Sequence, residues 1–531
     1  MTDNKDDAVS NSESHSSAGV NTALQTTPDG SQFQFSKELR EFYEGHNCNV
    51  SGDSLSFHCP YRYVRLNPRY DTQESLEMLR SEVRDHRENN SSGQDTTSMS
   101  NDNNTSPETT DVLSVPWLEA RWAFYALPAN FSLSTSQCFR SGRIYGMDVS
   151  SGAGVAVLLT DVNDHDAASE SEIIQTNAPT GSSLDGTGEL RILDLCCSPG
   201  LKLLQMADFF HRQSLTNSNG DTKKQRPVKV VGVDICQHRI NVCKNIVQKY
   251  FIDPKTSGRG EGSSNETPDN VGIQLYLEDG TTFGVKQLSN DVAPASNGQS
   301  GNLVFDSGVA TEEVIQRGGK RKRMNKSARA REKKRLRQIA TMESDFVRKE
   351  AHSLENESHC KDYKKDSQNC IGLFDYVLVD AECSTDGSFK HIKERIKESS
   401  YNEQNKDVGH REENTRLTDP DKLEELVDLQ RKLIDSGFRL LKNEGTLVYS
   451  TCSLSEDQNE MVVRWLLESH RDAVLIPTHF PSIKESKFVT EGSLKGTVRF
   501  YPNLVHDTKP TTLLLGDGFF VAKIRKISNK I

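Results

Sequence analysis

Two cysteines stand just past the ends of short apolar runs. Cys452 follows the run LVYST at 447–451, and Cys383 follows VLVDAE at 377–382. Runs of β-branched and apolar residues are typical of buried parallel strands, and ligands bind at the carboxyl ends of such strands. A single buried cysteine is usually an inert, small apolar residue. Two thiols at one edge of a sheet, beside Asp380, instead favour covalent chemistry in which a thiolate attacks a substrate.

A series of predicted strand–helix units would position these two thiols at the edge of a sheet. Strands are predicted at 191–196, 229–234, 272–277, 375–380 and 445–450, with helices at 201–210, 237–250 and 422–441. Alternation of this kind indicates an α/β fold with a doubly wound, mostly parallel, Rossmann-like sheet.

The turn after the first predicted strand favours a nucleoside cofactor without a pyrophosphate. The sequence CSPG at 197–200 carries a single glycine and does not match the dinucleotide pattern G-x-G-x-x-G. Asp234 ends the second strand, where a carboxylate can accept hydrogen bonds from ribose hydroxyls, and Asp279 follows the third, within reach of an adenine amine. Either acid alone could be a turn residue. Acids at three successive strand ends favour a cofactor such as S-adenosylmethionine.

Four segments carry motifs that occur together in one family. LDLCCSPGLK (193–202) is similar to D-x-C-A-x-P-G-x-K, and VDICQHRINVCKN (233–245) to D-x-x-x-x-R-L. VLVDAECSTDGS (377–388) is similar to D-x-P-C-S-G-x-G, and LVYSTCSLSEDQNE (447–460) to Y-S-T-C-S-L-x-x-x-E-N-E. From about residue 142 to 470 the chain resembles the NOP/Sun (Sun/RsmB-type) family of S-adenosylmethionine-dependent RNA cytosine-5 methyltransferases. The resemblance implies a class I methyltransferase sheet.

The resemblance also implies roles for named residues. Cys452 would add to carbon 6 of a cytosine that has left its stack, and Cys383 would help to remove the carbon 5 proton or release the adduct. Asp380 would hydrogen-bond the ring, and Lys202 would approach the substrate or cofactor. The implied cofactor contacts are Cys197, Ser198, Pro199, Gly200, Lys202, Asp234, Arg239, Asp279 and Asp380. No cysteine spacing suggests a metal site.

Two departures from the family pattern fall beside Cys383. Glu382 stands where the family has proline, and Thr385 where it has glycine. Without the proline we expect a looser loop, and a neighbouring carboxylate raises the pKa of a thiol. An alternative function is therefore a catalytically weak RNA-binding or assembly protein on the same fold. A methyltransferase for proteins or small molecules has no use for the Cys452 motif and ranks below both.

Composition divides the chain into a core and polar inserts. Of its 531 residues 34% are hydrophobic, and the mean hydropathy is -0.65. We expect a disordered tail at 1–32, an N-terminal RNA-positioning lobe at 33–141 and a catalytic domain at 142–531. Disordered inserts are predicted at about 88–110, 161–188, 254–270, 285–370 and 396–418.

The charge of the chain is unevenly distributed. The net charge is -11, yet residues 317–337 (RGGKRKRMNKSARAREKKRLR) hold twelve basic residues and one glutamate. Such a run attracts an import receptor or RNA, or is simply a solvated insert. We expect a protein of the nucleus or nucleolus, with the cytoplasm as the alternative. The acidic N-terminus resembles neither a secretory signal nor a mitochondrial presequence, and no apolar stretch is long enough to span a membrane.

The expected substrate is RNA, with transfer RNA preferred over ribosomal RNA because of the family's common substrates, and the expected state is a monomer. The segment 61–69 interleaves aromatic residues with arginines, which fits either an RNA contact or an exposed strand. Residues 117–127 suggest an amphipathic helix whose aromatic residues pack in the core. Ser455 and Gln458 suggest a capping box for the helix after Cys452, in which Met461 would be buried and Asn459 and Glu460 would be structural.

Overall fold

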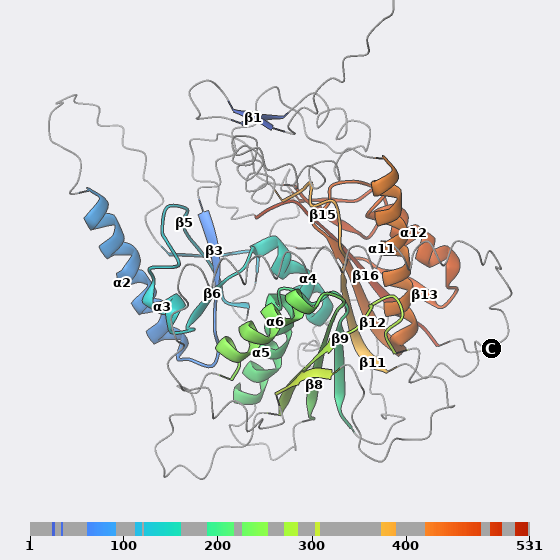
Figure 1. Ribbon diagram of the computed structural model, residues 1–531, viewed down its shortest axis with the longest axis horizontal. Coiled ribbons are helices and arrows are strands. Elements are labelled where there is room, and N and C mark those ends of the chain that lie inside the picture. The colour runs from blue at the N-terminus through green and yellow to red at the C-terminus, as the bar shows by residue number, and fades with distance from the viewer. Residues whose placement is uncertain are drawn as a thin grey trace, which may run out of the picture.

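The fold is given by a computed structural model (Figure 1). It describes residues 24–26, 33–35, 61–91, 112–118, 122–160, 188–216, 226–252, 270–284, 303–307, 373–388, 420–478, 480, 489–501 and 516–528. Within these ranges no helix is both long and apolar enough to cross a membrane.

A ten-stranded sheet forms the centre of the molecule. Its order is β10-β9-β8-β7-β11-β12-β16-β15-β14, and β13 also pairs with β16. The central strands β7 to β9, β11 and β12 are parallel, whereas β10 and β13 to β16 add antiparallel pairs at the sides. The bounds are β7 Leu190–Asp194, β8 Val228–Asp234, β9 Val271–Leu277, β10 Leu303–Asp306, β11 Phe374–Asp380, β12 Leu441–Thr451, β13 Ala473–Ile476, β14 Val489–Glu491, β15 Val498–Phe500 and β16 Phe519–Lys526. The predicted doubly wound α/β fold is confirmed.

Helices cover both faces of this sheet (Figure 1). One face carries α4 (Val149–Leu159), α5 (Leu201–Thr216) and α6 (Gln237–Tyr250), and the other carries α11 (Pro420–Leu440) and α12 (Glu460–Ser469). Successive strand residues alternate between the two cores: Ile192 packs with the first group of helices and Leu193 with the second. Burial on both faces explains why the sequence of these strands is almost continuously apolar.

A second, antiparallel sheet lies beside α5. Its order is β4-β5-β3-β6, with β3 at Tyr61–Leu66, β4 at Leu113–Ser114, β5 at Phe124–Pro128 and β6 at Ile144–Gly146. Helices α2 (Thr72–Ser91) and α3 (Gln137–Arg140) pack on it. Most of these elements fall within the predicted N-terminal lobe at 33–141.

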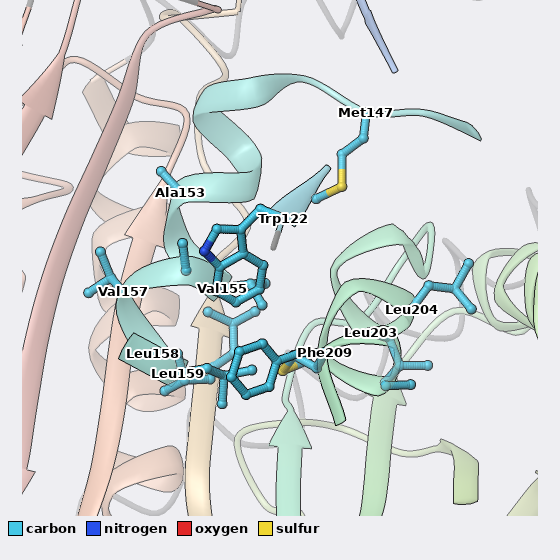
Figure 2. Close-up of a cluster of buried hydrophobic side chains, with 14 of the residues drawn as sticks. Trp122, Met147, Ala153, Val155, Val157, Leu158, Leu159, Leu203, Leu204 and Phe209 are labelled. Carbon is cyan, nitrogen blue, oxygen red and sulfur yellow. The ribbon is translucent and has the colours of Figure 1, made fainter. Parts of the chain in front are cut away.

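The predicted helix at 117–127 is wrong, although its aromatic residues do pack in the core. The segment enters β5, where Phe124 and Ala126 pack in one hydrophobic core and Leu127 in another, as alternate residues of a strand do. Figure 2 shows Trp122 beside Phe209 of α5, and their rings stack with centroids 5.1 Å apart. Trp122 therefore joins the small sheet to α5, which covers the large sheet.

The reading of residues 61–69 as an exposed strand is also wrong, because β3 is a buried inner strand. Arg65 is fully buried and donates to the backbone oxygen of Trp122 at 2.9 Å and to Asp208 of α5 at 2.5 Å. Arg69 pairs with the other oxygen of the same carboxylate. Burial alone would raise the pKa of Asp208, but the two arginines outweigh it and lower the pKa. The charges of Arg65 and Arg69 are thus used inside the protein, whereas Arg62 is half-buried, and an RNA contact of this segment stays a prediction.

Three predicted disordered segments contain structure. β1 (Leu24–Thr26), in the expected tail, pairs with β2 (Phe33–Phe35). Helix α2 runs to Ser91, into the insert at 88–110, and β10 lies within the insert at 285–370. The basic run 317–337 and the greater part of the other inserts lie outside the described residues.

We expect Asp208→Ala to lower the free energy of unfolding by about 3–5 kcal/mol, because it leaves the buried charge of Arg65 without its partner. Urea unfolding measures the change. Glu74→Ala is the control: it breaks the ion pair with Arg143, but Glu74 is 63% exposed, so the loss should stay below about 1 kcal/mol. Equal losses in the two variants would contradict this role of Asp208.

Candidate active site

The two predicted cysteines meet at the carboxyl edge of the central sheet. β11 and β12 are parallel neighbours, with Asp380 opposite Ser450, so the loops that follow them leave the sheet side by side. The Sγ atoms of Cys383 and Cys452 lie 3.2 Å apart. Both side chains are partly exposed, so a substrate can reach them.

Cys452 is held as a thiol in this arrangement. Its hydrogen bond with Cys383 and its burial raise its pKa well above the ordinary value, and the charges of Asp380 and Asp386 add to the effect. A thiolate is the nucleophilic form of cysteine. For Cys452 to act as a nucleophile, this proton would have to be removed first.

Asp380 and Lys202 form an ion pair beside the thiols. Lys202 Nζ donates to Asp380 Oδ2 at 2.6 Å, and Ser450 Oγ donates to Oδ1 at 2.7 Å. Burial would lower the pKa of Lys202, but the charge and hydrogen bond of Asp380 outweigh it and raise the pKa. The amine therefore stays protonated at neutral pH, and the carboxylate has a fixed orientation at the strand end.

The turn between β7 and α5 depends on Gly200. Its φ is +102°, and a Cβ atom there would lie 3.3 Å from the Cα of Cys243 in α6. Only glycine accepts both the backbone conformation and the close approach. Ser198 and Pro199, the preceding predicted cofactor contacts, lie in this turn at the sheet edge, and Pro199 is exposed.

Cys197, a predicted cofactor contact, does not offer its side chain to a ligand. Its thiol is buried, 3.9 Å from Cys243 Sγ, and its backbone N–H donates to Val233 at 3.0 Å. The strand pairing turns this side chain inward, below Gly232, where a Cβ atom would touch it at 3.0 Å.

Acidic groups end three neighbouring strands. Asp194 of β7 is buried, and burial, followed by the charge of Asp380, raises its pKa to about 7. Its Oδ1 has no hydrogen-bond partner within the described structure. Asp234 of β8 is also buried, which raises its pKa, although Cys236 N–H donates to it at 2.9 Å and Arg239 lies 3.2 Å away. Arg239 is thus placed to hold Asp234.

Asp279, after β9, lies at the exposed end of this row. It accepts hydrogen bonds from the backbone and hydroxyl of Thr281 at 2.9 and 2.8 Å, as a turn residue does. The buried, unpartnered oxygen of Asp194 and the carboxylate of Asp234 fit a ligand that carries an amine and hydroxyl groups. S-adenosylmethionine has both, so this edge fits the predicted cofactor.

Sequence reasoning missed the polar network behind the thiols. The capping box at Ser455 and Gln458 is wrong: α12 begins at Glu460, and Gln458 hydrogen-bonds Ser384 instead. Met461, expected to be buried, is 42% exposed. No periodicity could have revealed contacts between two loops. The register of the predicted parallel strands could have revealed Ser450, which stands opposite Asp380.

Asn459 and Glu460 are structural, as the sequence suggested. Asn459 Nδ2 donates to Ser453 O at 2.9 Å and its Oδ1 accepts from Thr451 at 2.6 Å. Glu460 forms a buried ion pair with Arg499 of β15. These contacts fix the segment that follows Cys452.

Comparison with known proteins supports the resemblance seen in the motifs. Residues 321–525 match the model of the family described as 16S rRNA methyltransferase RsmB/F. "Ribosomal RNA small subunit methyltransferase F" of Escherichia coli O17:K52:H18 is 35% identical over 157 residues, or 29% of this chain and 26% of the relative. The protein of the same name from Shigella boydii serotype 18 is 34% identical over the same shares. The chain thus matches about a quarter of these curated relatives' length. The predicted resemblance to this family is confirmed, and it indicates S-adenosylmethionine as the cofactor.

Solved structures are similar at a lower level. NSun6 from Pyrococcus horikoshii with SFG has a TM-score of 0.43 and 14% identity, covering 93% of this chain and 99% of that one. A methyltransferase homolog from the same organism has a TM-score of 0.40 and 16% identity, with 88% of each chain covered. Similarity at this level carries no argument about function.

We expect Cys383→Ala to speed the alkylation of Cys452 by iodoacetamide at neutral pH. Cys383 accepts the proton of the Cys452 thiol in the hydrogen bond that raises the pKa of Cys452, so its removal lowers that pKa, and each unit of decrease yields about tenfold more thiolate. Mass spectrometry of the peptide that contains Cys452, measured between pH 6 and 10, gives the profile. Cys383→Ser, which keeps a hydrogen-bonding group, should shift it less. Identical profiles for wild type and Cys383→Ala would refute the coupling.

Proposed function

We propose, from the similarity of this chain to the RsmB/F methyltransferases, that it transfers a methyl group from S-adenosylmethionine to carbon 5 of a cytosine in RNA. The observation that carries the proposal is the pair of thiols 3.2 Å apart at a strand edge that also holds Asp380 and Lys202. Methyl transfer to oxygen or nitrogen needs no thiol, because those atoms are nucleophiles themselves. Carbon 5 of cytosine is not, and a thiolate that adds to carbon 6 makes it one.

In this mechanism the proton of the Cys452 thiol is transferred to N3 of the cytosine while its sulfur bonds to carbon 6, which converts the ring to an enamine. Asp380 accepts a hydrogen bond from the cytosine amino group, and Lys202 keeps the carboxylate oriented through its 2.6 Å contact. When bound, S-adenosylmethionine supplies the methyl group that the enamine carbon takes up. Asp194 and Asp234 are the side chains that would hold it.

Release completes the reaction. A base takes the proton from carbon 5, the ring double bond re-forms, and the sulfur of Cys452 leaves with the electron pair of the carbon–sulfur bond. Cys383 lies beside that sulfur and is the group we assign to this step.

Two classes of RNA, transfer RNA and ribosomal RNA, are candidate substrates. The sequence favoured transfer RNA, whereas the curated relatives are named for the RNA of the small ribosomal subunit. Our proposal therefore covers methylation of RNA in general, and the assay uses both RNAs as substrates.

We expect wild-type protein to transfer label from S-adenosylmethionine to one of these RNAs as 5-methylcytosine. Cys452→Ala should lower the rate by ~10³-fold or more, since it removes the nucleophile. Cys383→Ala should accumulate a protein–RNA adduct that survives denaturant, because attack proceeds and release does not. Gel electrophoresis under denaturing conditions and nucleoside mass spectrometry give the two readouts.

Cys138→Ala serves as a control, because that thiol is buried in α3, in the separate hydrophobic core of the small sheet. Label that persists with Cys452→Ala would refute the covalent mechanism. If wild type labels neither RNA while it still binds the cofactor, the alternative of a catalytically weak RNA-binding protein replaces the proposal, and Glu382→Pro would be the first change to test.

We further propose that the run 317–337 directs the chain to the nucleus. Its twelve basic residues fit an acidic import receptor. Replacing Lys320, Arg321, Lys322 and Arg323 with alanine should shift a fluorescently tagged chain toward the cytoplasm. An unchanged distribution would contradict this proposal.

A further inference from the structure

The loop that carries Cys383 has a conformation that its own sequence does not favour. Thr385, at the position where the family pattern has glycine, lies at φ +56°. A β-branched residue is rarely found in this left-handed region, and such a residue persists there only when its surroundings impose it. Something outside the loop therefore holds Cys383 where it is.

Asp386 supplies the first tie. Its carboxylate is fully buried. Oδ1 accepts a hydrogen bond from Ser384, the residue after Cys383, and Oδ2 accepts one from the backbone N–H of Leu454, two residues after Cys452, at 2.8 Å. One carboxylate thus connects the two thiol loops.

Gln458 forms the second connection to the Cys383 loop. It also determines that Ser384 is the donor in the hydrogen bond between Ser384 and Asp386. Its Oε1 accepts from the Ser384 N–H at 3.0 Å, while its Nε2 donates to Ser384 Oγ at 2.9 Å. Because the hydroxyl oxygen receives this donor, its own proton is free for Asp386. The family pattern has glutamate at this position. A glutamate could not donate, and it would compete with Asp386 for the one hydroxyl proton.

The same network replaces the missing proline. Gln430 of α11 donates to the backbone oxygen of Glu382 at 2.8 Å and contacts Gln458 Oε1 at 3.2 Å. On the other side of the loop, Gly387 N–H donates to Cys452 O at 2.9 Å, so closely that a Cβ atom would lie 2.7 Å from that oxygen. Buried hydrogen bonds from three segments hold the loop that a proline would otherwise stiffen.

We propose that Asp386 and Gln458 are positioning residues for the thiol pair. Their side chains hold the strained Cys383 loop against the Cys452 loop and thereby fix the two sulfur atoms in contact. The role in catalysis rests on the proposed methyl transfer, but the effect on the thiols does not.

The test compares two isosteric variants, Asp386→Asn and Gln458→Glu, with wild type. Diamide removes one hydrogen from each of two neighbouring thiols, so that they join as a disulfide and the diamide becomes a hydrazine. Its rate of cross-linking Cys383 to Cys452 is followed by peptide mass spectrometry and divided by the thiolate fraction of Cys452 from the alkylation profile of the same variant, because the charge of Asp386 also acts on the pKa of Cys452. The corrected rate reports how well the sulfurs are held together without any methyl transfer. We expect both variants to cross-link about tenfold more slowly or worse, and to lose kcat by a similar factor with little change in KM for RNA.

Asn67→Asp is the matched control. Asn67 is buried and donates to the backbone oxygens of Gly142 and Tyr250, so this change removes an amide donor just as Gln458→Glu does, but far from the thiols. It should lower the melting temperature while the thiols still cross-link at the wild-type rate. If Gln458→Glu or Asp386→Asn does not fold, Ser384→Ala, which removes only the joining hydroxyl, should show the same loss.

Variants that fold and cross-link at the wild-type rate would overturn the proposal, as would wild-type protein that forms no Cys383–Cys452 disulfide. Slow cross-linking in the variants, combined with no methyl transfer even by wild type, would uphold the positioning role and reject the proposed function alone.

Discussion

The parallel pairing of β11 with β12 is the constraint on which the rest of the site depends. It sets Val379 opposite Tyr449 and Asp380 opposite Ser450, and so delivers two loops to one point of the sheet edge. Both faces of these strands are buried, and successive residues enter opposite cores. A shift of the register by one residue would move every side chain to the wrong face, so packing fixes the position of the thiols before any polar contact does.

Electrostatics add a second layer. Three carboxylates, those of Asp194, Asp234 and Asp380, gather at one strand edge, and burial raises the pKa of the first two. The cation of Lys202 offsets the charge of Asp380. An edge so rich in carboxylates favours a ligand that is itself positive, and S-adenosylmethionine carries both an ammonium and a sulfonium group. The pKa of Cys452 is raised first by its hydrogen bond with Cys383 and by burial, and the charge of Asp380 adds to this effect.

Features with a local cause could be predicted from sequence, and features with a distant cause could not. Helix α6 (Gln237–Tyr250) was predicted with its observed bounds, and the buried parallel strands were recognised because each is a nearly continuous apolar run. Arg65 was misread because its partner, Asp208, is 143 residues away, and a charged residue in a strand usually faces water. Gln458 was misread because the capping-box pattern describes a helix start, whereas its real partners are on another loop. β10 was missed because it is short and surrounded by polar sequence, and only its pairing with β9 makes it a strand.

The order of the strands has a consequence for how the protein is made. β12 lies between β11 and β16, and its residues Thr446 to Thr451 pair antiparallel with Phe520 to Arg525. During synthesis, Cys452 emerges with one side of its strand still open, since residues 519–526 are translated later. An unpaired edge rich in apolar residues is a template for aggregation. A nascent chain at this stage carries both thiols and the carboxylates of Asp194, Asp234 and Asp380, but the strand that leads to Cys452 is paired on both sides only once β16 has been inserted.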